Sequence, residues 1–584
     1  MSEFIVFCVV KSEDGFLKCI ESLKPLANKF FFLGINREVE KFLTHHNGRA
    51  FLDSTLFFEK SIDYAKQYIN IEKSYGILVD SEMIFKNTSL NIANLEKDCY
   101  NLLRIYNDLE SNQIHLIKLS KKWRYENDQW ICDEPVTNTN LGKNVAYIEE
   151  TKDLYKDPNM YSEYIKNGKN SDLLFYSHLK LGDFSDTESE KIYHYLEACN
   201  KNPERSEGFY KLSRHYRNCG KYFLASQFIL LGKNIQKPQR QYLFLDDKVY
   251  SYGFDEEMSI VGYYVDKYVD DGFSSCTKIM LSRKIDKSVQ DLAFENQYHY
   301  IKPYPWKNKI NIKLYEDDQF KCTSSSFINM GTFFLGIQRY VNYSIVRENG
   351  GYIIRDPQNH IITKNALYVK TGNHLNVLGF LHTKVPKRRE SHIKGLEDMR
   401  IFIYRNEIYA FATTFEWGLY EKPNQVLCKL NGLEITRIVP LNYKQEYQQK
   451  NWCPFIWNDK ICCVYSYEPL RILEIDEFTG ECKEIMNKYC EYNLVKFRGN
   501  TSPVFYNNEY IVIVHEYYTK GSRHYFHRII RFDENWNVKH VSLPFYIENK
   551  QIEYVLGFDR IKDNTYLLHY STMDNTSNFV EIEI

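Results

Sequence analysis

The chain lacks both a long hydrophobic run and an excess of one charge. No stretch reaches the roughly 18 consecutive apolar residues that a transmembrane helix needs. Lys and Arg together number 75, and Asp and Glu number 76. Charges this closely balanced create no strong field toward nucleic acid or an anionic membrane. We therefore expect neither a membrane span nor a nucleic-acid partner.

The chain also lacks a cysteine framework. Its 14 cysteines are scattered, and the closest pair, Cys462 and Cys463, is adjacent instead of spaced as CxxC. This pattern predicts neither a zinc site nor a set of disulfides. The apolar run Phe4–Val10 is too short for a secretory signal and is expected to form a first buried strand. A reducing, cytoplasmic location is the resulting expectation.

Several catalytic motifs are missing as well. The sequence contains no Walker loop, G-x-G-x-x-G, H-E-x-x-H or G-x-S-x-G, and His515-Glu516 has no second histidine four residues later. These absences argue against kinases, dinucleotide-dependent dehydrogenases, zinc proteases and serine hydrolases.

What is present indicates a globular protein of several domains. The chain has 584 residues, of which 43% are hydrophobic and 16% aromatic. This length exceeds what one hydrophobic core supports. Changes in pattern along the chain predict an α/β domain over 1–184, a helical connector over 185–294 and an all-β domain over 295–584.

The first 150 residues alternate between predicted strands and helices, which favours a largely parallel sheet. Strands are expected at 5–10, 30–33 and 75–79, with a helix over 14–26. The strand at 75–79 leads into Asp80-Ser81-Glu82. Two acids with one residue between them can share a divalent ion at the carboxyl end of a strand. A solvated pair of acids at a strand end is the alternative.

Two helices joined by a short turn are predicted in the connector. Phe209, Leu212 and Tyr216 share one helical face, and Ala225 with Phe228 continue on a second helix. The intervening Asn218-Cys219-Gly220 breaks the first helix. Such a helical hairpin is the unit of a tetratricopeptide-type repeat.

Hairpin-like turns recur in the last 290 residues at steps of about 50 to 57 residues, the scale of a four-stranded propeller blade. They are Asn349-Gly350-Gly351, Arg405-Asn406-Glu407, Asn458-Asp459, Asn507-Asn508 and Asp563-Asn564. This predicts a five-bladed β-propeller.

A polar cluster precedes each turn at a similar distance. The clusters are Arg339 with Asn342, Glu397-Asp398-Met399-Arg400, Lys450-Asn451-Trp452, Arg498 to Pro503, and Glu553-Tyr554. Equal phase implies an equivalent position on each blade, so these clusters should meet at one end of the central channel.

Two motifs near the N-terminus resemble family 2 glycosyltransferases. Val10 to Asp14 followed by Cys19 to Leu23 resembles the opening V-K-N-E…C-L-x-S, and Trp123 to Glu134 resembles a later W-x-Y…H-E stretch, with Cys132 in place of the histidine. The resemblance implies a GT-A-like domain that uses a nucleotide sugar with Mn²⁺ or Mg²⁺ at Asp80 and Glu82.

The C-terminal 250 residues resemble glycoside hydrolase family 130 and glycosyltransferase family 108, which are β-mannoside phosphorylases and mannosyltransferases. Gly395 to Ile401 resembles G-x-E-D-P-R-I, with Met399 in place of proline, and Lys496 to His515 keeps a 19-residue step. Phe545 to Gly557 resembles the closing segment. The resemblance implies a five-bladed propeller that needs no cofactor.

Inversion at a sugar carbon needs an acid opposite a nucleophile, and a phosphate nucleophile needs cations around it. The candidate acid is Asp398, whose alternative role is structural, as a partner of Arg400 or a turn cap. The candidate groups for phosphate or donor binding are Lys450, Lys496, Arg498 and His515; an isolated His515 would be a core histidine. The candidate groups for sugar binding are Arg339, Asn342, Glu397 and Arg400.

These motifs together predict a glycan-synthesising enzyme. Its propeller would transfer or phosphorolyse β-linked mannose by inversion, using GDP-mannose or another nucleotide sugar, or mannose 1-phosphate, with a glycan as acceptor. Its N-terminal module would be a nucleotide-sugar-dependent glycosyltransferase. Two alternatives stay open: a single family 2-like activity with a glycan-binding propeller, and a non-catalytic carbohydrate-binding scaffold.

Overall fold

The computed structural model of the chain describes residues 158–169, 171–238, 245–313, 317–346, 351–443 and 450–584, together with Tyr315. Earlier in the chain it describes 4–10, 27–34, 49–51, 74–80, 83–87, 95–97, 99–106, 109–119, 123–126, 129–132, 137–140 and 146–150, with Cys19, Ser22, Leu23 and Leu90. These residues form two compact units, Met1–Val265 and Asp266–Ile584. Among the described helices, none is both long and apolar enough to cross a membrane.

The described residues of the first unit form a nine-stranded mixed sheet. Eight strands follow the order β3-β2-β1-β4-β7-β6-β11-β5, and the ninth, β10, pairs with β6. Its strands are β1 (Phe4–Val10), β2 (Ala27–Gly34), β3 (Arg49–Phe51), β4 (Tyr75–Asp80), β5 (Met83–Asn87), β6 (Cys99–Tyr106), β7 (Leu109–Lys118), β10 (Asn138–Asn140) and β11 (Ala146–Glu150). A separate hairpin joins β8 (Trp123–Glu126) to β9 (Gln129–Cys132).

The three predicted N-terminal strands are confirmed as β1, β2 and β4. They lie side by side, because β1 pairs in parallel with both β2 and β4. Their buried apolar side chains, Val6, Cys8 and Ile77 among them, explain the continuous hydrophobic runs of this segment. The predicted helix over 14–26 lies outside the described residues except for Cys19, Ser22 and Leu23.

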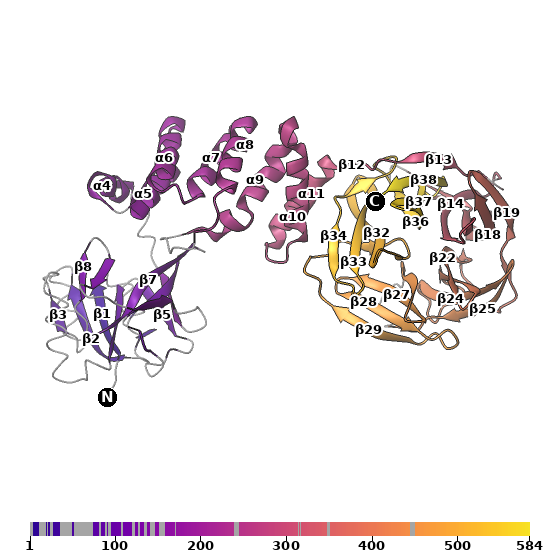
Figure 1. The fold of residues 1–584 in the computed structure, drawn as a ribbon, viewed down its shortest axis with the longest axis horizontal. Helices are drawn as coiled ribbons and strands as arrows, with labels where there is room; N and C mark the ends of the chain where they lie inside the picture. Colours follow the sequence, from indigo (N-terminus) through magenta and orange to yellow (C-terminus); the bar gives the residue numbers. More distant parts are fainter. Residues whose placement is uncertain are drawn as a thin grey trace. The chain divides into compact units, whose positions relative to one another are not determined.

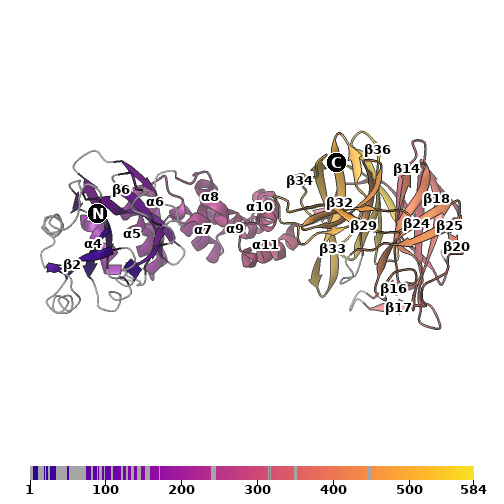
Figure 2. The ribbon, with the colours of Figure 1, turned by 90° about the horizontal axis from the view of Figure 1, so that it is seen from below.

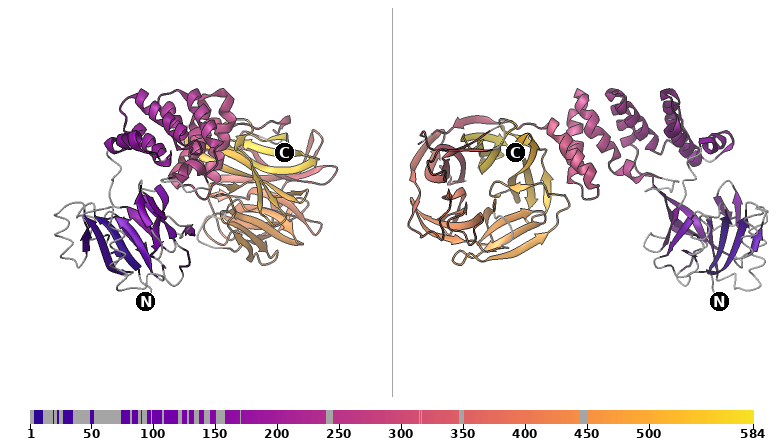
Figure 3. Two further views of the ribbon diagram at one scale, coloured as in Figure 1. Left: turned by 60° about the vertical axis from the view of Figure 1, so that its left-hand side comes forward. Right: turned by 180° about the vertical axis from the view of Figure 1, so that it is seen from behind.

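Helices follow the sheet in the chain. They are α4 (Pro158–Asn167), α5 (Ser171–Phe184), α6 (Glu188–Lys201), α7 (Glu207–Asn218), α8 (Tyr222–Lys233) and α9 (Phe254–Val261), preceded by a π-helical turn at Val249–Gly253. Figure 3 shows α5 to α8 as successive hairpins. The two predicted connector helices are confirmed as α7 and α8: Tyr216 of α7 stacks on Phe228 of α8 at 5.4 Å, and Gly220 makes the turn at φ +70°.

The second unit begins with two helices, α10 (Val269–Leu281) and α11 (Lys287–Tyr300). The division between the units, at Val265, therefore falls inside the predicted connector. Phe294 of α11 stacks on Tyr518 at 4.0 Å, and Phe273, Met280 and Tyr300 join a core cluster with residues of the β-rich part. These two helices thus pack on the propeller.

Five sheets form a ring in the second unit, as Figure 1 shows. The first blade contains β14 (Lys321–Asn329), β15 (Phe334–Val341), β18 (Ile361–Thr371) and β19 (His374–Phe380), with β21 (Ile393–Lys394) beside β18; the second contains β22 (Glu397–Tyr404), β23 (Glu407–Thr414), β24 (Asn424–Asn431), β25 (Glu434–Pro440) and β20 (His382–Thr383).

The third blade contains β26 (Cys453–Trp457), β27 (Lys460–Tyr467), β28 (Leu470–Ile475) and β29 (Cys482–Lys488). The fourth contains β30 (Arg498–Gly499), β31 (Val504–Tyr506), β32 (Glu509–Lys520), β33 (Ser522–Asp533), β34 (Val538–Val541), β35 (Phe545–Tyr546) and β12 (Lys302–Pro303). The fifth contains β36 (Glu553–Lys562), β37 (Thr565–Thr572), β38 (Asn578–Glu583) and β13 (Lys307–Asn311).

The fifth blade closes the ring. Its outermost strand, β13, comes from the start of the β-rich segment and pairs antiparallel with β38, with Ile310 opposite Phe579. Strands β14, β22 and β36 lie toward the centre (Figure 1). The core is divided into wedges between neighbouring blades, as where Tyr409 and Trp452 pack in one cluster between the second and third blades.

Four of the five predicted turns are confirmed as the turns between the two inner strands of a blade. The pairs Arg405-Asn406, Asn458-Asp459 and Asn507-Asn508 all have positive φ at both residues, and Asp563 has φ +43°. Such turns suit the twist of antiparallel strands.

The prediction for the first turn is wrong in its position on the blade. Gly351 precedes β17 (Tyr352–Ile354), which pairs only with β16 (Tyr343–Ile345) in a hairpin inserted between β15 and β18; Asn349 and Gly350 lie outside the described residues. The equivalent turn of the first blade is near Gly331, between β14 and β15. Figure 2 shows the β16–β17 hairpin at one end of the propeller.

Candidate functional site

A β-bulge sets the position of Asp398 at the start of β22. Glu397 pairs with Thr413 and Arg400 pairs with Phe411, so two residues of β22 face a single residue of β23. Asp398 is the first of the two and has φ +49°. Aspartate tolerates this left-handed conformation better than most residues, and bulges commonly re-aim a side chain.

Gly395 fixes the approach to this bulge. It has φ +98°, and a Cβ there would lie 2.3 Å from the carbonyl oxygen of Thr363. Its N–H donates to Glu416 at 2.8 Å. Only glycine fits this position, which explains why the G-x-E-D stretch begins as it does.

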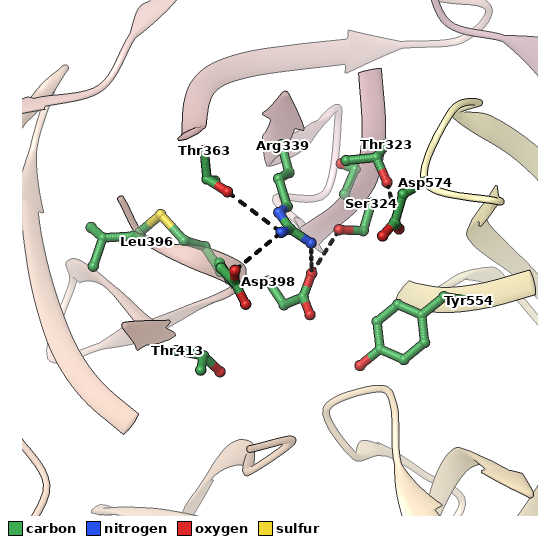
Figure 4. Close-up of polar contacts among 12 residues, drawn as sticks. Thr323, Ser324, Arg339, Thr363, Leu396, Asp398, Thr413, Tyr554 and Asp574 are labelled. Atoms are coloured by element: carbon green, nitrogen blue, oxygen red, sulfur yellow. Dashed lines mark hydrogen bonds and ion pairs between the residues drawn. The ribbon is translucent and has the colours of Figure 1, made fainter. Parts of the chain in front are cut away.

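Arg339, from the neighbouring strand β15, holds the carboxylate of Asp398. Its Nη1 donates to Oδ1 at 2.9 Å, and Ser324 Oγ of β14 donates to the same oxygen at 2.9 Å. Figure 4 shows the guanidinium between Thr363 and Asp398, with Tyr554 on the far side of Asp398. The side chain of Asp398 is 22% exposed, whereas that of Arg339 is 6% exposed. One face of the carboxylate is therefore open.

These contacts decide the charge of Asp398. Burial by itself would raise its pKa, but the charges of Arg339 and Arg400 and the hydrogen bond from Ser324 outweigh it and hold the pKa below the usual aspartate value. Asp398 is therefore a carboxylate at neutral pH. It is arranged to accept a proton.

Glu397 and Lys450 lie beside this pair. Glu397 is 3.6 Å from Arg339 Nη2 and 3.8 Å from Lys450 Nζ. The lysine side chain is 44% exposed. It is thus an exposed cation beside the site, able to meet an anionic part of a ligand.

Arg400 joins three blades behind Asp398. It is 1% exposed, its Nε donates to the carbonyl oxygen of Asn500 at 3.0 Å, and its Nη2 donates to Tyr554 Oη at 2.9 Å. Tyr554 in turn donates to Asn451 Oδ1 at 3.1 Å. Four of the predicted clusters therefore meet around Arg400, and the fifth joins them through the contact of Arg339 with Asp398, as the equal phase predicts.

His515 lies in the same region but is not a cation. Burial, followed by the nearby charges of His527, Arg498 and Arg400, lowers its pKa to about 3. Its Nδ1 is hydrogen-bonded to Asn500 Oδ1. A neutral imidazole does not supply the positive charge that the sequence analysis assigned to it.

Two predicted site residues, Lys496 and Asn342, lie elsewhere, and a third, Arg498, pairs with His515 on the neighbouring strand but directs its hydrogen bonds to backbone groups. Lys496 Nζ is 3.3 Å from Asp291 of α11 and 4.5 Å from the ring centroid of Phe294, so it is part of the packing between helix and propeller. The exposed Arg498 bonds to the carbonyl oxygens of Val495 and Phe497. The Asn342 side chain bridges backbone groups of His360 and Ile362 and holds the base of the β16–β17 hairpin.

Sequence reasoning missed several groups beside Asp398. Asp574, in the loop before β38, accepts hydrogen bonds from Tyr343 at 2.7 Å and Thr323 at 3.2 Å. Ser324 and Thr323 belong to the polar run Thr323 to Ser326 of β14, a buried strand with an unusual number of hydroxyl groups. That run was the signal in the sequence, because buried hydroxyl groups need partners.

In the first unit, Asp80 is the last residue of β4 and lies opposite Val9 of β1. This places its backbone at the carboxyl edge of the parallel strands. Its side chain lies outside the described residues, as does Glu82.

No family model matches the chain. A segment of 136 residues is 29% identical to β-mannosyltransferase 3 of Candida albicans, covering 20% of this chain and 24% of that protein. The chain thus matches about a quarter of the length of this relative.

Solved structures with partial likeness include a GDP-Man-dependent mannosyltransferase from Leishmania mexicana (12% identity, 48% of this chain, 90% of that chain, TM-score 0.34). A mannose phosphorylase from Leishmania mexicana in complex with phosphate has 12% identity, covers 50% of this chain and 91% of that chain, and gives a TM-score of 0.33. Likenesses at these TM-scores carry no weight for fold or function.

Proposed function

We propose that the propeller transfers mannose with inversion at the anomeric carbon, so that it forms or phosphorolyses β-linked mannosides. Asp398 is the group that accepts or donates the proton. The observation that carries this proposal is the ionised, partly open carboxylate of Asp398, held by Arg339 and Ser324 at the end of the channel. The partial sequence similarity to a protein named β-mannosyltransferase 3 supports mannose as the sugar.

The charge state of Asp398 suits the step in which an acceptor hydroxyl is deprotonated. In inverting transfer, an acceptor oxygen attacks the anomeric carbon while the bond to the phosphate leaving group breaks. The acceptor proton passes to a base, directly or through a sugar hydroxyl, and the phosphate leaves with the electron pair. A carboxylate that is ionised at neutral pH can act as this base, and the same group in its protonated form acts as the acid in the reverse reaction, phosphorolysis.

The donor is a nucleotide sugar, GDP-mannose first, or mannose 1-phosphate, and the acceptor is a glycan. Lys450 is the exposed cation nearest Asp398 for the donor phosphate, and Arg498 is a second candidate. Glu397, Arg400 and Arg339 shape the sugar side of the site. No cofactor is required in the propeller.

Replacing Asp398 by Asn tests the proposal. The amide keeps the shape of the side chain but accepts no proton, so mannosyl transfer from GDP-mannose or mannose 1-phosphate should fall by about 10²- to 10⁴-fold. Sugar binding should remain within a few-fold. Asp459→Asn, in an exposed turn, is the matched control. A wild-type rate in Asp398→Asn would move the chemistry to the N-terminal module and leave the propeller as a glycan-binding domain.

For the first unit we propose a GT-A-like module that binds a nucleotide sugar with Mn²⁺ or Mg²⁺ at Asp80 and Glu82. The parallel arrangement of β2, β1 and β4 supports it, because ligands bind beyond the carboxyl ends of such strands. The oxygen ligands of two carboxylates suit either ion.

Calorimetry with GDP-mannose and Mn²⁺ tests this module. The metal-dependent part of the binding should be lost on adding a chelator and in the double variant Asp80→Ala with Glu82→Ala, while the propeller stays folded and keeps its metal-independent binding. An affinity that does not change with chelator would contradict the metal role.

A further inference from the structure

A buried line of polar groups runs behind His515. Asn500 Oδ1 faces His515 Nδ1, Asn500 Nδ2 lies 3.2 Å from His527 Nδ1, and His527 Nε2 lies 3.4 Å from Glu553 Oε1. Asn500, His527 and Glu553 are fully buried, and His515 is 5% exposed. Of these four residues, which we call the relay, only His515 reaches solvent.

The direction of the hydrogen bonds at Asn500 follows from the negative charge of Glu553 beside His527. The two oxygens of Glu553 accept the backbone N–H groups of Ile547 at 2.6 Å and Glu548 at 2.9 Å, the surroundings of a carboxylate. His527 Nε2 makes no hydrogen bond among the described residues, but the carboxylate 3.4 Å away favours a hydrogen on this nitrogen over a bare lone pair. In a neutral imidazole, Nδ1 of His527 is then an acceptor.

The same logic passes through Asn500 to His515. Because Nδ1 of His527 accepts, the amide nitrogen of Asn500 donates to it, and the amide oxygen faces His515. That oxygen accepts the hydrogen on His515 Nδ1. Among the described residues, no hydrogen bond engages His515 Nε2, so this nitrogen presents a lone pair.

We propose that Asn500, His527 and Glu553 are positioning residues that hold His515 as the neutral Nδ1–H tautomer, so that Nε2 accepts a hydrogen bond from a hydroxyl of the mannoside. This proposal rests on the proposed function of the propeller. A lone pair repels a phosphate oxygen and attracts a hydroxyl. His515 therefore selects the sugar and does not bind phosphate.

The charged surroundings agree with this role. Arg400 and Arg498 lie close enough to oppose a positive charge on His515, and Tyr525 and Tyr554 flank its ring at 5.0 and 5.8 Å between centroids. Aromatic rings beside a hydroxyl acceptor are typical of sugar sites. Lys496, which would complete a phosphate cradle, is turned toward α11 instead.

Nitrogen NMR of the whole chain labelled with ¹⁵N-histidine tests the tautomer, because protonated and bare ring nitrogens have different shifts. His515→Gln identifies the signal, and His540→Gln, at an exposed position, is the control for assignment. We expect one protonated and one bare nitrogen at pH 7. Methyl β-mannoside should move the bare nitrogen, and inorganic phosphate should leave it unchanged.

Two variants test the relay without an activity measurement. Glu553→Gln removes the carboxylate that orients the relay, so His515 Nε2 should become partly protonated and mannoside affinity should fall about tenfold, the scale of one hydrogen bond. Glu548→Gln, whose side chain instead bonds Lys309 and Tyr570, should leave both unchanged. If Glu553→Gln fails to fold, the wild-type spectra alone decide.

The outcomes separate the two proposals. If His515 Nε2 is protonated in the wild type, the proposed relay is overturned, and the proposed mannosyl activity is not affected. A charged His527 would produce this result. A shift of His515 on adding inorganic phosphate also overturns the relay. Absence of any mannoside binding by the wild type overturns the proposed function together with the hydroxyl contact.

Discussion

At the residue scale, one ion pair sets the chemistry of the site. Asp398 sits in a bulge with a left-handed backbone, where burial favours its neutral form and Arg339 favours its charged form. Because the two effects oppose each other, the charge of the carboxylate depends on the groups around it, first on Arg339 and then on Arg400 and Ser324. The alternative role of Asp398 as a partner of Arg400 is only partly realised, since Arg400 donates to its backbone oxygen and not to its carboxylate.

Arg339→Met should therefore raise the pKa of Asp398. The acid limb of the pH profile of mannosyl transfer, which follows protonation of the base, should move to higher pH, measured as kcat/KM against pH. Arg405→Met, in an exposed turn, is the control and should keep the wild-type profile. An unmoved acid limb in Arg339→Met would show that Asp398 is not the base.

At the element scale, the sequence predicts what is local and misses what is not. The Asn- and Asp-rich turns such as Asn458-Asp459 were readable because short hairpins need positive φ. The turn at Gly351 was misplaced because an inserted hairpin carries the same turn chemistry as a blade. Lys496 matched a motif by spacing, but its direction depends on α11, which pairs with it from about 200 residues earlier.

The residues of the site divide in the same way. Asp398 and Arg400 were predictable because their spacing on one strand fixes them. Asp574 and Ser324 were not, because the contacts of Asp574 depend on how the first blade meets the last, and those of Ser324 on how the first blade meets the second. A single sequence does not show which residues of different blades contact each other.

A buried polar network joins α11 to the fourth blade. Arg528 Nε donates to Glu516 at 3.1 Å, and Gln297 of α11 bonds both side chains. All three residues are fully buried. Arg528→Met would leave the charge of Glu516 without its partner and should cost about 3 to 5 kcal/mol of unfolding free energy.

The double variant Arg528→Met with Glu516→Gln tests whether the unpaired charge of Glu516 causes this loss of stability. It removes the unpaired charge, so it should be more stable than Arg528→Met alone in urea unfolding. Equal stability of the single and double variants would show that packing around Arg528, and not its charge, holds α11 in place.

At the scale of the whole propeller, buried neutral histidines predict sensitivity to acid. Burial lowers the pKa of both His515 and His569 to about 3, whereas an unfolded histidine titrates near about 6.5. Between these values the unfolded state binds one more proton at each position. The contribution of these two histidines to the free energy of unfolding is therefore fully present above about pH 6.5 and is lost as the pH drops toward about 3.

Urea unfolding between pH 8 and 4, followed by the fluorescence of the buried Trp452 and Trp536, measures this loss. The variant His569→Gln should lower the slope of stability against pH by about one proton below pH 6.5 and leave it unchanged above. Parallel curves for wild type and variant over the whole range would contradict the neutral, buried state of His569.

The ring is closed by a strand from its beginning paired with a strand from its end, β13 with β38. During synthesis on the ribosome, β13 therefore stays unpaired until the strands of all five blades up to β38 have been synthesised. Asp574, which precedes β38, and Tyr554 also arrive late. The candidate site is thus assembled in one late step, and a nascent chain arrested before residue 578 exposes an unpaired strand edge, which makes it a substrate for chaperones and leaves the site incomplete.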